Sequence, residues 1–212
     1  MEAAVRVAVA QMRMTRSVAT NVSRICSFVD EARRSRARLV VFPECATTGY
    51  TADSPSRTSP AELREAERTI AAACAEAKVT AVVGTPHHRG DDEFAGSSGG
   101  GGGGGGPQWY NSATVISCDG QVVGRQHKMQ LVPTDTPWAV GGERLGVFHL
   151  NDAGPIAVRR EAGRQPPPST APHIISTSRQ RTAPPAVLHL PRPTTTPPCS
   201  RVHVHPARVP SR

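Results

Sequence analysis

Two residues of opposite charge occur in settings that suggest chemistry. Glu44 follows the apolar run at residues 39–42 and Pro43, and Lys128 lies in the segment 127–133. A positioned carboxylate can accept a proton, and an ammonium can stabilise negative charge that develops during a reaction. Together the two residues look like two members of a catalytic triad whose third member is a cysteine.

The chain has five cysteines, and their irregular spacing does not suggest a disulfide framework. They are Cys26, Cys45, Cys74, Cys118 and Cys199. The first and third lie on or beside predicted helix stripes and are interpreted as small buried hydrophobes. Cys45 is adjacent to Glu44, but neighbouring residues on an extended backbone point to opposite faces. None of the five is therefore expected to be the nucleophile.

The first 42 residues predict a βαβ unit. Residues 5–11 are rich in valine and read as a strand. Apolar residues between Val18 and Ala32 then recur at spacings of three and four, which indicates one face of a helix. Residues 39–42 form a short continuous apolar run, typical of a strand buried on both faces. This order favours the α/β fold class.

A second helix and further strands follow. Ser59, Pro60 and Glu62 supply an N-cap, a first-turn proline and a capping-box glutamate. A strand is predicted at residues 79–84, and strands at residues 110–116 and 121–125 flank a turn, as in a hairpin. Between them, a glycine-rich insert at residues 96–107 is expected to be a flexible surface loop.

Six segments of the chain, in this order, resemble the N-terminal half of the nitrilase superfamily, the carbon–nitrogen hydrolases. They are residues 7–11, 42–45, 48–50, 110–113, 119–124 and 128–131. The resemblance covers residues 3–158. It implies a nitrilase-type α-β-β-α sandwich, here incomplete, with residues 1–158 as a partial hydrolase domain, and it implies homo- or hetero-oligomers.

The resemblance also implies roles for three residues. Members of the family hydrolyse nitriles, amides or carbamoyl groups with a Glu-Lys-Cys triad, so no cofactor is expected. Glu44 corresponds to the general base that takes the thiol proton and later activates water, and Lys128 to the ammonium that stabilises the tetrahedral intermediate. Asp135 falls near where many members carry a second, supporting glutamate. Because aspartate is shorter by one methylene, this role stays open.

Arg159 stands where a family member carries its cysteine. Residues 154–158 resemble the strand that leads to the nucleophile, but Arg159, Arg160 and Glu161 follow it. A guanidinium cannot form a thioester. We therefore expect a homologue of an enzyme that converts a small amide, carbamoyl compound or nitrile to an acid plus ammonia or an amine, truncated before its nucleophile and inactive as written.

Residues 159–212 carry the excess positive charge of the chain. They hold nine arginines and one acidic residue, whereas the preceding residues have equal numbers of acids and bases. This proline-rich tail shows no helix or strand period, so it is expected to stay disordered. Its abrupt onset suggests a frameshift or a mis-spliced gene. A neutral body lacks the basic face of a nucleic-acid-binding domain, so no specific nucleic-acid partner is expected.

Other classes of site find little support in the sequence. His87, His88, His203 and His205 lack the spacing of a metal site. No apolar run approaches the ~20 residues of a membrane helix, and no secretory signal is apparent. A cytoplasmic setting without a membrane partner is therefore expected.

Two further expectations concern partners. The expected partner of an active chain is a small amide or nitrile; the alternative is a non-catalytic interaction protein that pairs with an intact paralogue. The absent second half would normally cover the sheet made by the first half. We therefore expect exposed apolar sheet surface and poor solubility.

Overall fold

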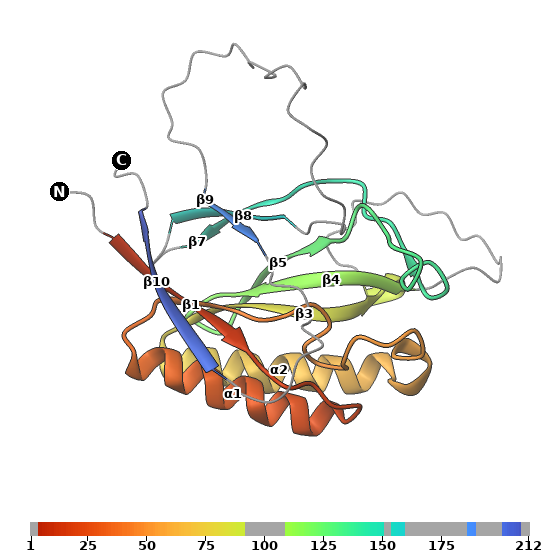
Figure 1. Cartoon of the computed structure of the whole chain (residues 1–212), viewed down its shortest axis with the longest axis horizontal. Coiled ribbons are helices and arrows are strands. Elements are labelled where there is room, and N and C mark those ends of the chain that lie inside the picture. The colour runs from red at the N-terminus through yellow and green to blue at the C-terminus, as the bar shows by residue number, and fades with distance from the viewer. Residues whose placement is uncertain (1–3, 92–108, 151–153, 160–185, 190–200, 209–212) are drawn as a thin grey trace, which may run out of the picture.

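The computed structural model describes residues 4–91, 109–150, 154–159, 186–189 and 201–208, and for Ala4, Pro55, Arg159 and the last two ranges it describes the backbone alone. Two helices lie on one face of a larger mixed sheet, and a smaller sheet lies on its other face (Figure 1). The α/β class predicted from the sequence is confirmed.

The first half of the larger sheet is parallel. Strand β1 (Ala4–Gln11) pairs with β2 (Leu39–Val41), and β2 pairs with β3 (Thr80–His88). Helices α1 (Val18–Arg34) and α2 (Pro60–Ala77) make the two crossovers and cover one face of the sheet (Figure 1). All three residues of β2 are buried, as its continuous apolar run predicts.

The second half of the larger sheet is mostly antiparallel. Strand β4 (Trp109–Ile116) pairs with β3 and with β5 (Val122–His127), and the short β6 (Ala139–Val140) runs parallel to β4. The predicted hairpin is thus present, and β3 extends to His88, beyond the predicted end. Two 3-10 turns, η1 (Pro55–Arg57) and η2 (Arg89–Asp91), precede α2 and follow β3.

Local sequence signals explain the start and end of α2. The side chain of Ser59 accepts a hydrogen bond from the backbone N–H of Glu62 at 3.1 Å, and Pro60 opens the first turn. The helix ends at Lys78, whose left-handed backbone donates its N–H to the carbonyl of Cys74. Apolar residues of both helices pack on the sheet and form the larger core, which includes Ile25, Phe42 and Ile70.

The smaller sheet corrects one expectation about exposed surface. It consists of β7 (Val147–Leu150), β8 (Gly154–Arg159) and β9 (Ala186–His189). Phe148, Leu150, Ile156 and Val158 form a second core cluster with valines of the larger sheet. The expectation that this sheet face is exposed is wrong for the described residues, because the β7–β8 hairpin already covers it.

Two segments of the tail depart from the expected disorder. The backbone of β9 pairs parallel with β8, and the backbone of β10 (Arg201–Arg208) pairs antiparallel with β1. The unpaired hydrogen-bonding groups of an edge strand attract such additions, and Val202 and Val204 alternate with polar residues as a strand requires. The other tail residues and the glycine-rich insert lie outside the described residues.

Candidate active site

Glu44 is delivered to the site by the end of β2. The chain passes through buried Phe42 and Pro43 and then turns over residues 44–48. Strand β3 approaches this turn so closely that a Cβ on Gly84 would lie 2.2 Å from the carbonyl oxygen of Pro43. Only glycine permits this approach, so β3 fixes the backbone from which the Glu44 carboxylate projects.

Lys128 follows β5 and points its ammonium into the interior. Its backbone N–H donates to the carbonyl of Asn111 at 2.8 Å, and its own carbonyl accepts from Gly142 N–H at 2.9 Å. The side chain is only 4% exposed. Its Nζ donates to Glu44 Oε1 at 2.9 Å and lies 2.7 Å from Asp135 Oδ2. The structure therefore brings together all three residues singled out in the sequence.

Asp135 is the most deeply buried of these three residues, with a side chain that is 0% exposed. Besides Lys128, it accepts hydrogen bonds from the backbone N–H of Val132 at 3.1 Å, from Asn111 Nδ2 at 2.9 Å and from the hydroxyl of Tyr50 at 3.0 Å. Burial raises the pKa of Asp135, but these donors and the charge of Lys128 outweigh burial, and the pKa lies below its ordinary value. The group is therefore a carboxylate at neutral pH.

Asn111 and Tyr50 join the cluster although neither was singled out as a site residue. Asn111 is fully buried, and its amide nitrogen donates both to Glu44 Oε1 at 2.6 Å and to Asp135 Oδ1. Lys128 Nζ also lies 5.8 Å from the ring centre of Tyr50. Both residues belong to segments that carried the family resemblance, which was the available signal for them.

Negative charge dominates the electrostatics of the cluster. Two carboxylates face one ammonium, and the Tyr50 hydroxyl lies beside them. Burial, followed by the charges of Asp135 and Glu44, raises the pKa of Tyr50 well above its ordinary value, so this phenol stays protonated and remains a donor. The smaller sheet lies over the face of β4 that is opposite the helices (Figure 1). Ala113 and Val115 of β4 pack against the smaller sheet. Because side chains alternate along a strand, Asn111 lies on the same face of β4 as these two residues. The cluster thus lies on the inner face of the larger sheet.

The geometry of Cys45 differs from the expectation. The residue is not extended: it lies in the turn after β2 with a positive φ of 51°. Its buried Sγ contacts Asn111 Oδ1 at 3.5 Å, so the thiol and the Glu44 carboxylate share one amide as a partner. The argument from opposite faces of a strand is therefore wrong for Cys45.

The other described cysteines lie on or beside the helices and the β4–β5 hairpin, and Arg159 ends a strand of the smaller sheet. Cys74 is buried on α2, Cys26 and Cys118 are half-buried, and Cys199 lies outside the described residues. Arg159 is the last residue of β8, directly after buried Val158, and its backbone pairs with His189 of β9. The end of a strand in the smaller sheet is thus occupied by arginine.

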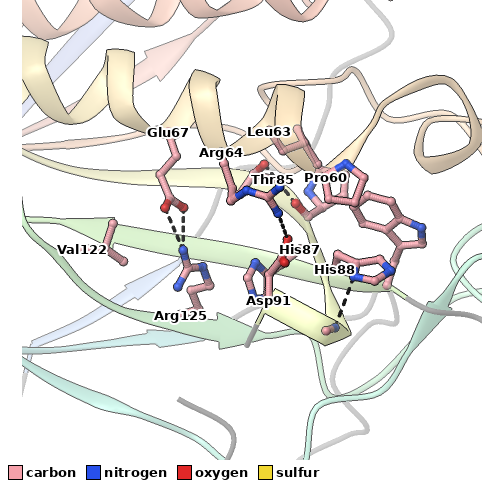
Figure 2. A pocket seen from close by; sticks show the side chains of 13 residues that line it. Pro60, Leu63, Arg64, Glu67, Thr85, His87, His88, Asp91, Val122 and Arg125 are labelled. Atoms are coloured by element: carbon pink, nitrogen blue, oxygen red, sulfur yellow. Dashed lines mark hydrogen bonds and ion pairs between the residues drawn. The ribbon is translucent and has the colours of Figure 1, made fainter. Parts of the chain in front are cut away.

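A separate pocket of about 550 Å³ lies on the helix side of the larger sheet (Figure 2). Its charged groups are paired: Arg125 Nη2 donates to both carboxylate oxygens of Glu67 at 2.8 Å, and Arg64 contacts Asp91 at 2.5 Å. Glu44, Lys128 and Asn111 do not line this pocket. His87 does line it, yet the described part of the chain contains no group of three or more side chains able to hold a metal ion.

None of the described helices is both long and apolar enough to cross a membrane. A scan against protein families matches residues 6–155 to the family described as carbon-nitrogen hydrolase. A search of curated proteins found no match.

Several solved structures are similar to the chain. The NitN amidase of Nesterenkonia sp. AN1 is 19% identical with a TM-score of 0.60, and the match covers 74% of this chain and 56% of the amidase. A variant of that amidase with its glutamate and cysteine replaced, in complex with acrylamide, is 18% identical with a TM-score of 0.60, covering 74% and 55% of the two chains. A cysteine-to-alanine variant in complex with butyramide is 18% identical with a TM-score of 0.59 and the same coverage. The chain spans little more than half the length of these amidases, and the likeness is one of fold.

Proposed function

The chain belongs to the carbon–nitrogen hydrolase family, and from that premise we propose that Glu44, Lys128 and Asp135 form the hydrolytic centre of a nitrilase-type enzyme. The centre is incomplete because Arg159 takes the place of the nucleophile. The observation that carries the proposal is the buried Lys128 ammonium, which lies 2.9 Å from Glu44 Oε1 and 2.7 Å from Asp135 Oδ2. The proposed hydrolase part lies within residues 1–158.

The complete reaction assigns a step to each charged group. A thiol gives its proton to Glu44 while its sulfur forms a bond to the carbonyl carbon of the amide. The Lys128 ammonium stabilises the oxyanion that forms. The C–N bond breaks, ammonia leaves with the proton held by Glu44, and a thioester remains. Water, deprotonated by Glu44, then releases the acid and restores the thiol.

The hydrogen bonds of the cluster support these roles. The Lys128 ammonium must be held in place to stabilise an oxyanion, and its ion pair with Asp135 at 2.7 Å holds it there. Asn111 donates to both carboxylates and so spaces them around the ammonium. The substrate class follows from the relatives: an amidase of similar fold has been solved with acrylamide and with butyramide. We propose a small primary amide.

The test restores the nucleophile and detects it chemically. A related amidase variant carries the acetamide moiety of fluoroacetamide on its active-site cysteine. In Arg159→Cys we expect the new thiolate to displace fluoride from fluoroacetamide and form one thioether that the unmodified chain does not form. Intact-mass spectrometry should detect it at least about 10-fold faster than in the matched surface variant Arg68→Cys. Adding Lys128→Met to Arg159→Cys should slow the adduct, because the reacting amide loses its electrostatic partner.

An ammonia-release assay with butyramide decides the state of the chain as written. The unmodified chain should release none. If it does release ammonia and Cys45→Ser abolishes this activity, then the nucleophile has been misassigned, since the Cys45 thiol already lies at the Asn111 amide.

A second proposed function is a non-catalytic interaction protein that pairs with an intact paralogue. Exposed apolar side chains at the start of the smaller sheet favour it: Leu145 is 56% exposed and Val147 is 48% exposed. Co-expression with a full-length homologue tests this proposal. A stable complex that Leu145→Glu disrupts would support pairing, and separate elution of the two chains would exclude it.

A further inference from the structure

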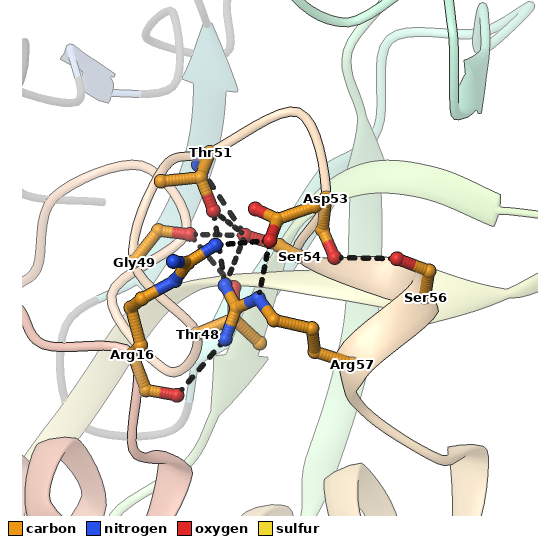
Figure 3. A network of polar contacts seen from close by, with 8 residues as sticks. All are labelled: Arg16, Thr48, Gly49, Thr51, Asp53, Ser54, Ser56 and Arg57. Carbon is orange, nitrogen blue, oxygen red and sulfur yellow. Dashed lines mark hydrogen bonds and ion pairs between the residues drawn. The ribbon is translucent and has the colours of Figure 1, made fainter.

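After Glu44 the chain turns away from the cluster and contacts it again at Tyr50. Between Tyr50 and the start of α2, hydrogen bonds and ion pairs hold the chain at the surface. Figure 3 shows these contacts, most of which involve Ser54 or Arg57. The residues drawn in Figure 3 include the neighbours of Tyr50 in the chain on both sides, Gly49 and Thr51.

Ser54 fixes the peptide that precedes Tyr50. Its hydroxyl is buried and donates to the carbonyl of Gly49 at 2.7 Å, and this carbonyl belongs to the peptide that links Gly49 to Tyr50. The same hydroxyl lies 2.8 Å from Thr51 Oγ1 and accepts from the backbone N–H of Thr51 at 3.3 Å. One side chain thus bonds to the backbone on both sides of Tyr50.

The guanidinium of Arg57 makes hydrogen bonds to three other residues around this segment. Its Nη2 donates to Thr51 Oγ1 at 3.0 Å, its Nη1 to the carbonyl of Arg16 at 3.1 Å, and its Nε to Asp53 at 3.0 Å. A hydrogen bond from Thr51, followed by the charges of Arg16 and Arg57, outweighs burial and lowers the pKa of Asp53, so the carboxylate stays ionised opposite the guanidinium. Arg57 therefore joins the loop before α1 to the loop that carries Tyr50.

The loop before α1 packs closely against the backbone that precedes Tyr50. Gly49 has a positive φ of 75°, and a Cβ there would lie 2.9 Å from the carbonyl oxygen of Thr15. At the other end of the Tyr50 side chain, the hydroxyl donates to Asp135 Oδ1 at 3.0 Å. The position of this hydroxyl is thus set by contacts to the backbone at Gly49 and Thr51.

We propose that Ser54 and Arg57 are positioning residues, which hold the Tyr50 hydroxyl on Asp135 and, through Asp135, orient the ammonium of Lys128. The catalytic meaning of this positioning rests on the proposed function, but the positioning itself does not. It acts on Tyr50 through the backbone, so its loss should be visible in the ionisation of the Tyr50 phenol as well as in turnover.

The first readout is an ultraviolet titration of the tyrosine hydroxyls. The chain holds two tyrosines, and Tyr50→Phe assigns the signal of Tyr50. In the unmodified chain Tyr50 should stay protonated up to alkaline unfolding, because burial, and then the charge and hydrogen bond of Asp135 and the charge of Glu44, raise its pKa. In Ser54→Ala and in Arg57→Leu we expect the Tyr50 hydroxyl to move off the Asp135 carboxylate. The pH at which the Tyr50 phenol ionises should then fall by about one unit or more, so that ionisation precedes unfolding.

Two controls separate positioning from general damage. Ser54→Thr keeps the hydroxyl and should retain the titration of the unmodified chain. Arg68→Leu removes an arginine that is paired with Glu65 on the surface of α2, away from Tyr50, and should also leave the titration unchanged. Arg57→Leu changes a side chain that is one quarter exposed, so it tests the claim without opening a buried cavity.

The second readout uses amide hydrolysis by Arg159→Cys. Adding Ser54→Ala should lower kcat about 10-fold, with rescue by Ser54→Thr. A shifted phenol titration without any hydrolysis in Arg159→Cys would uphold the positioning and overturn the proposed function. An unshifted Tyr50 titration in both Ser54→Ala and Arg57→Leu would overturn the positioning, whatever the activity.

Discussion

The contact between Lys128 and Asp135 allows a quantitative test of the buried cluster. In Asp135→Asn, the new amide nitrogen cannot accept the hydrogen bonds that Lys128 Nζ and Val132 N–H give to Oδ2 at 2.7 Å and 3.1 Å. Removing one partner of a buried ion pair costs about 3–5 kcal/mol, because the remaining charge stays buried without compensation. Glu44 still faces Lys128, so we expect the lower end, about 3 kcal/mol.

A double-mutant cycle isolates the pair. Lys128→Met alone leaves the carboxylates of Glu44 and Asp135 without their shared cation and should cost a similar amount. In the double variant both charges of the Lys128–Asp135 pair are gone, and replacing a whole buried pair is often close to neutral. The Glu44 carboxylate remains without the ammonium, as it does in Lys128→Met alone, and keeps its hydrogen bond from Asn111. We expect the double variant to be at least about 2 kcal/mol more stable than the sum of the two single effects implies.

The assay is urea unfolding followed by tryptophan fluorescence, since Trp138 is buried near the cluster. A loss of 3 kcal/mol should lower Tm by about 6–12 °C in a chain of this size. Arg68→Ala breaks the exposed pair with Glu65 and serves as the control, with an expected change within about 0.5 kcal/mol. Single effects below about 1 kcal/mol, or effects that simply add in the double variant, would refute the reasoning.

The pH dependence provides an independent arm of the same test. The folded-state pKa of Asp135 lies below its ordinary value. A group of this kind contributes stability that is fully present above its unfolded pKa of about 3.9 and is lost as the pH falls through the folded pKa. The difference in unfolding free energy between the unmodified chain and Asp135→Asn should therefore be largest above about pH 5 and shrink in more acidic solution.

Three further predictions follow from other parts of the fold. Asn21→Leu should cost about 3 kcal/mol in urea unfolding, because the buried Asn21 amide donates to two backbone carbonyls, at 2.8 Å and 3.0 Å, that tie together the loops after β1 and β2. Gly124→Val should cost about 1–3 kcal/mol, since a Cβ there would lie 2.6 Å from the Phe148 ring, and Phe148→Leu should recover part of this loss in the same measurement. Burial raises the pKa of Cys74 to about 12, so mass spectrometry should find it alkylated by iodoacetamide at neutral pH only as fast as the chain unfolds.

The sequence alone was sufficient for the local elements and for Glu44 and Lys128, and it named Asp135 with its role left open. Apolar spacing predicted α1, the capping residues predicted the start of α2, and the apolar run before Glu44 predicted β2. These signals are local, because helix and strand periods and caps depend on residues a few positions apart. Glu44 and Lys128 were found because each lies in a segment that resembles one family.

Tertiary structure decided how the cluster is built and how much of the sheet is covered. Glu44 and Lys128 are 84 residues apart, and only the packing of β2, β3, β4 and β5 brings their charges to 2.9 Å. The same packing buries Asp135, gives Asn111 two carboxylates to bond, and places the β7–β8 hairpin over a sheet face that was expected to be bare. A hydrogen bond between distant segments depends on where the backbone carries both partners, and no periodicity along the chain encodes that position.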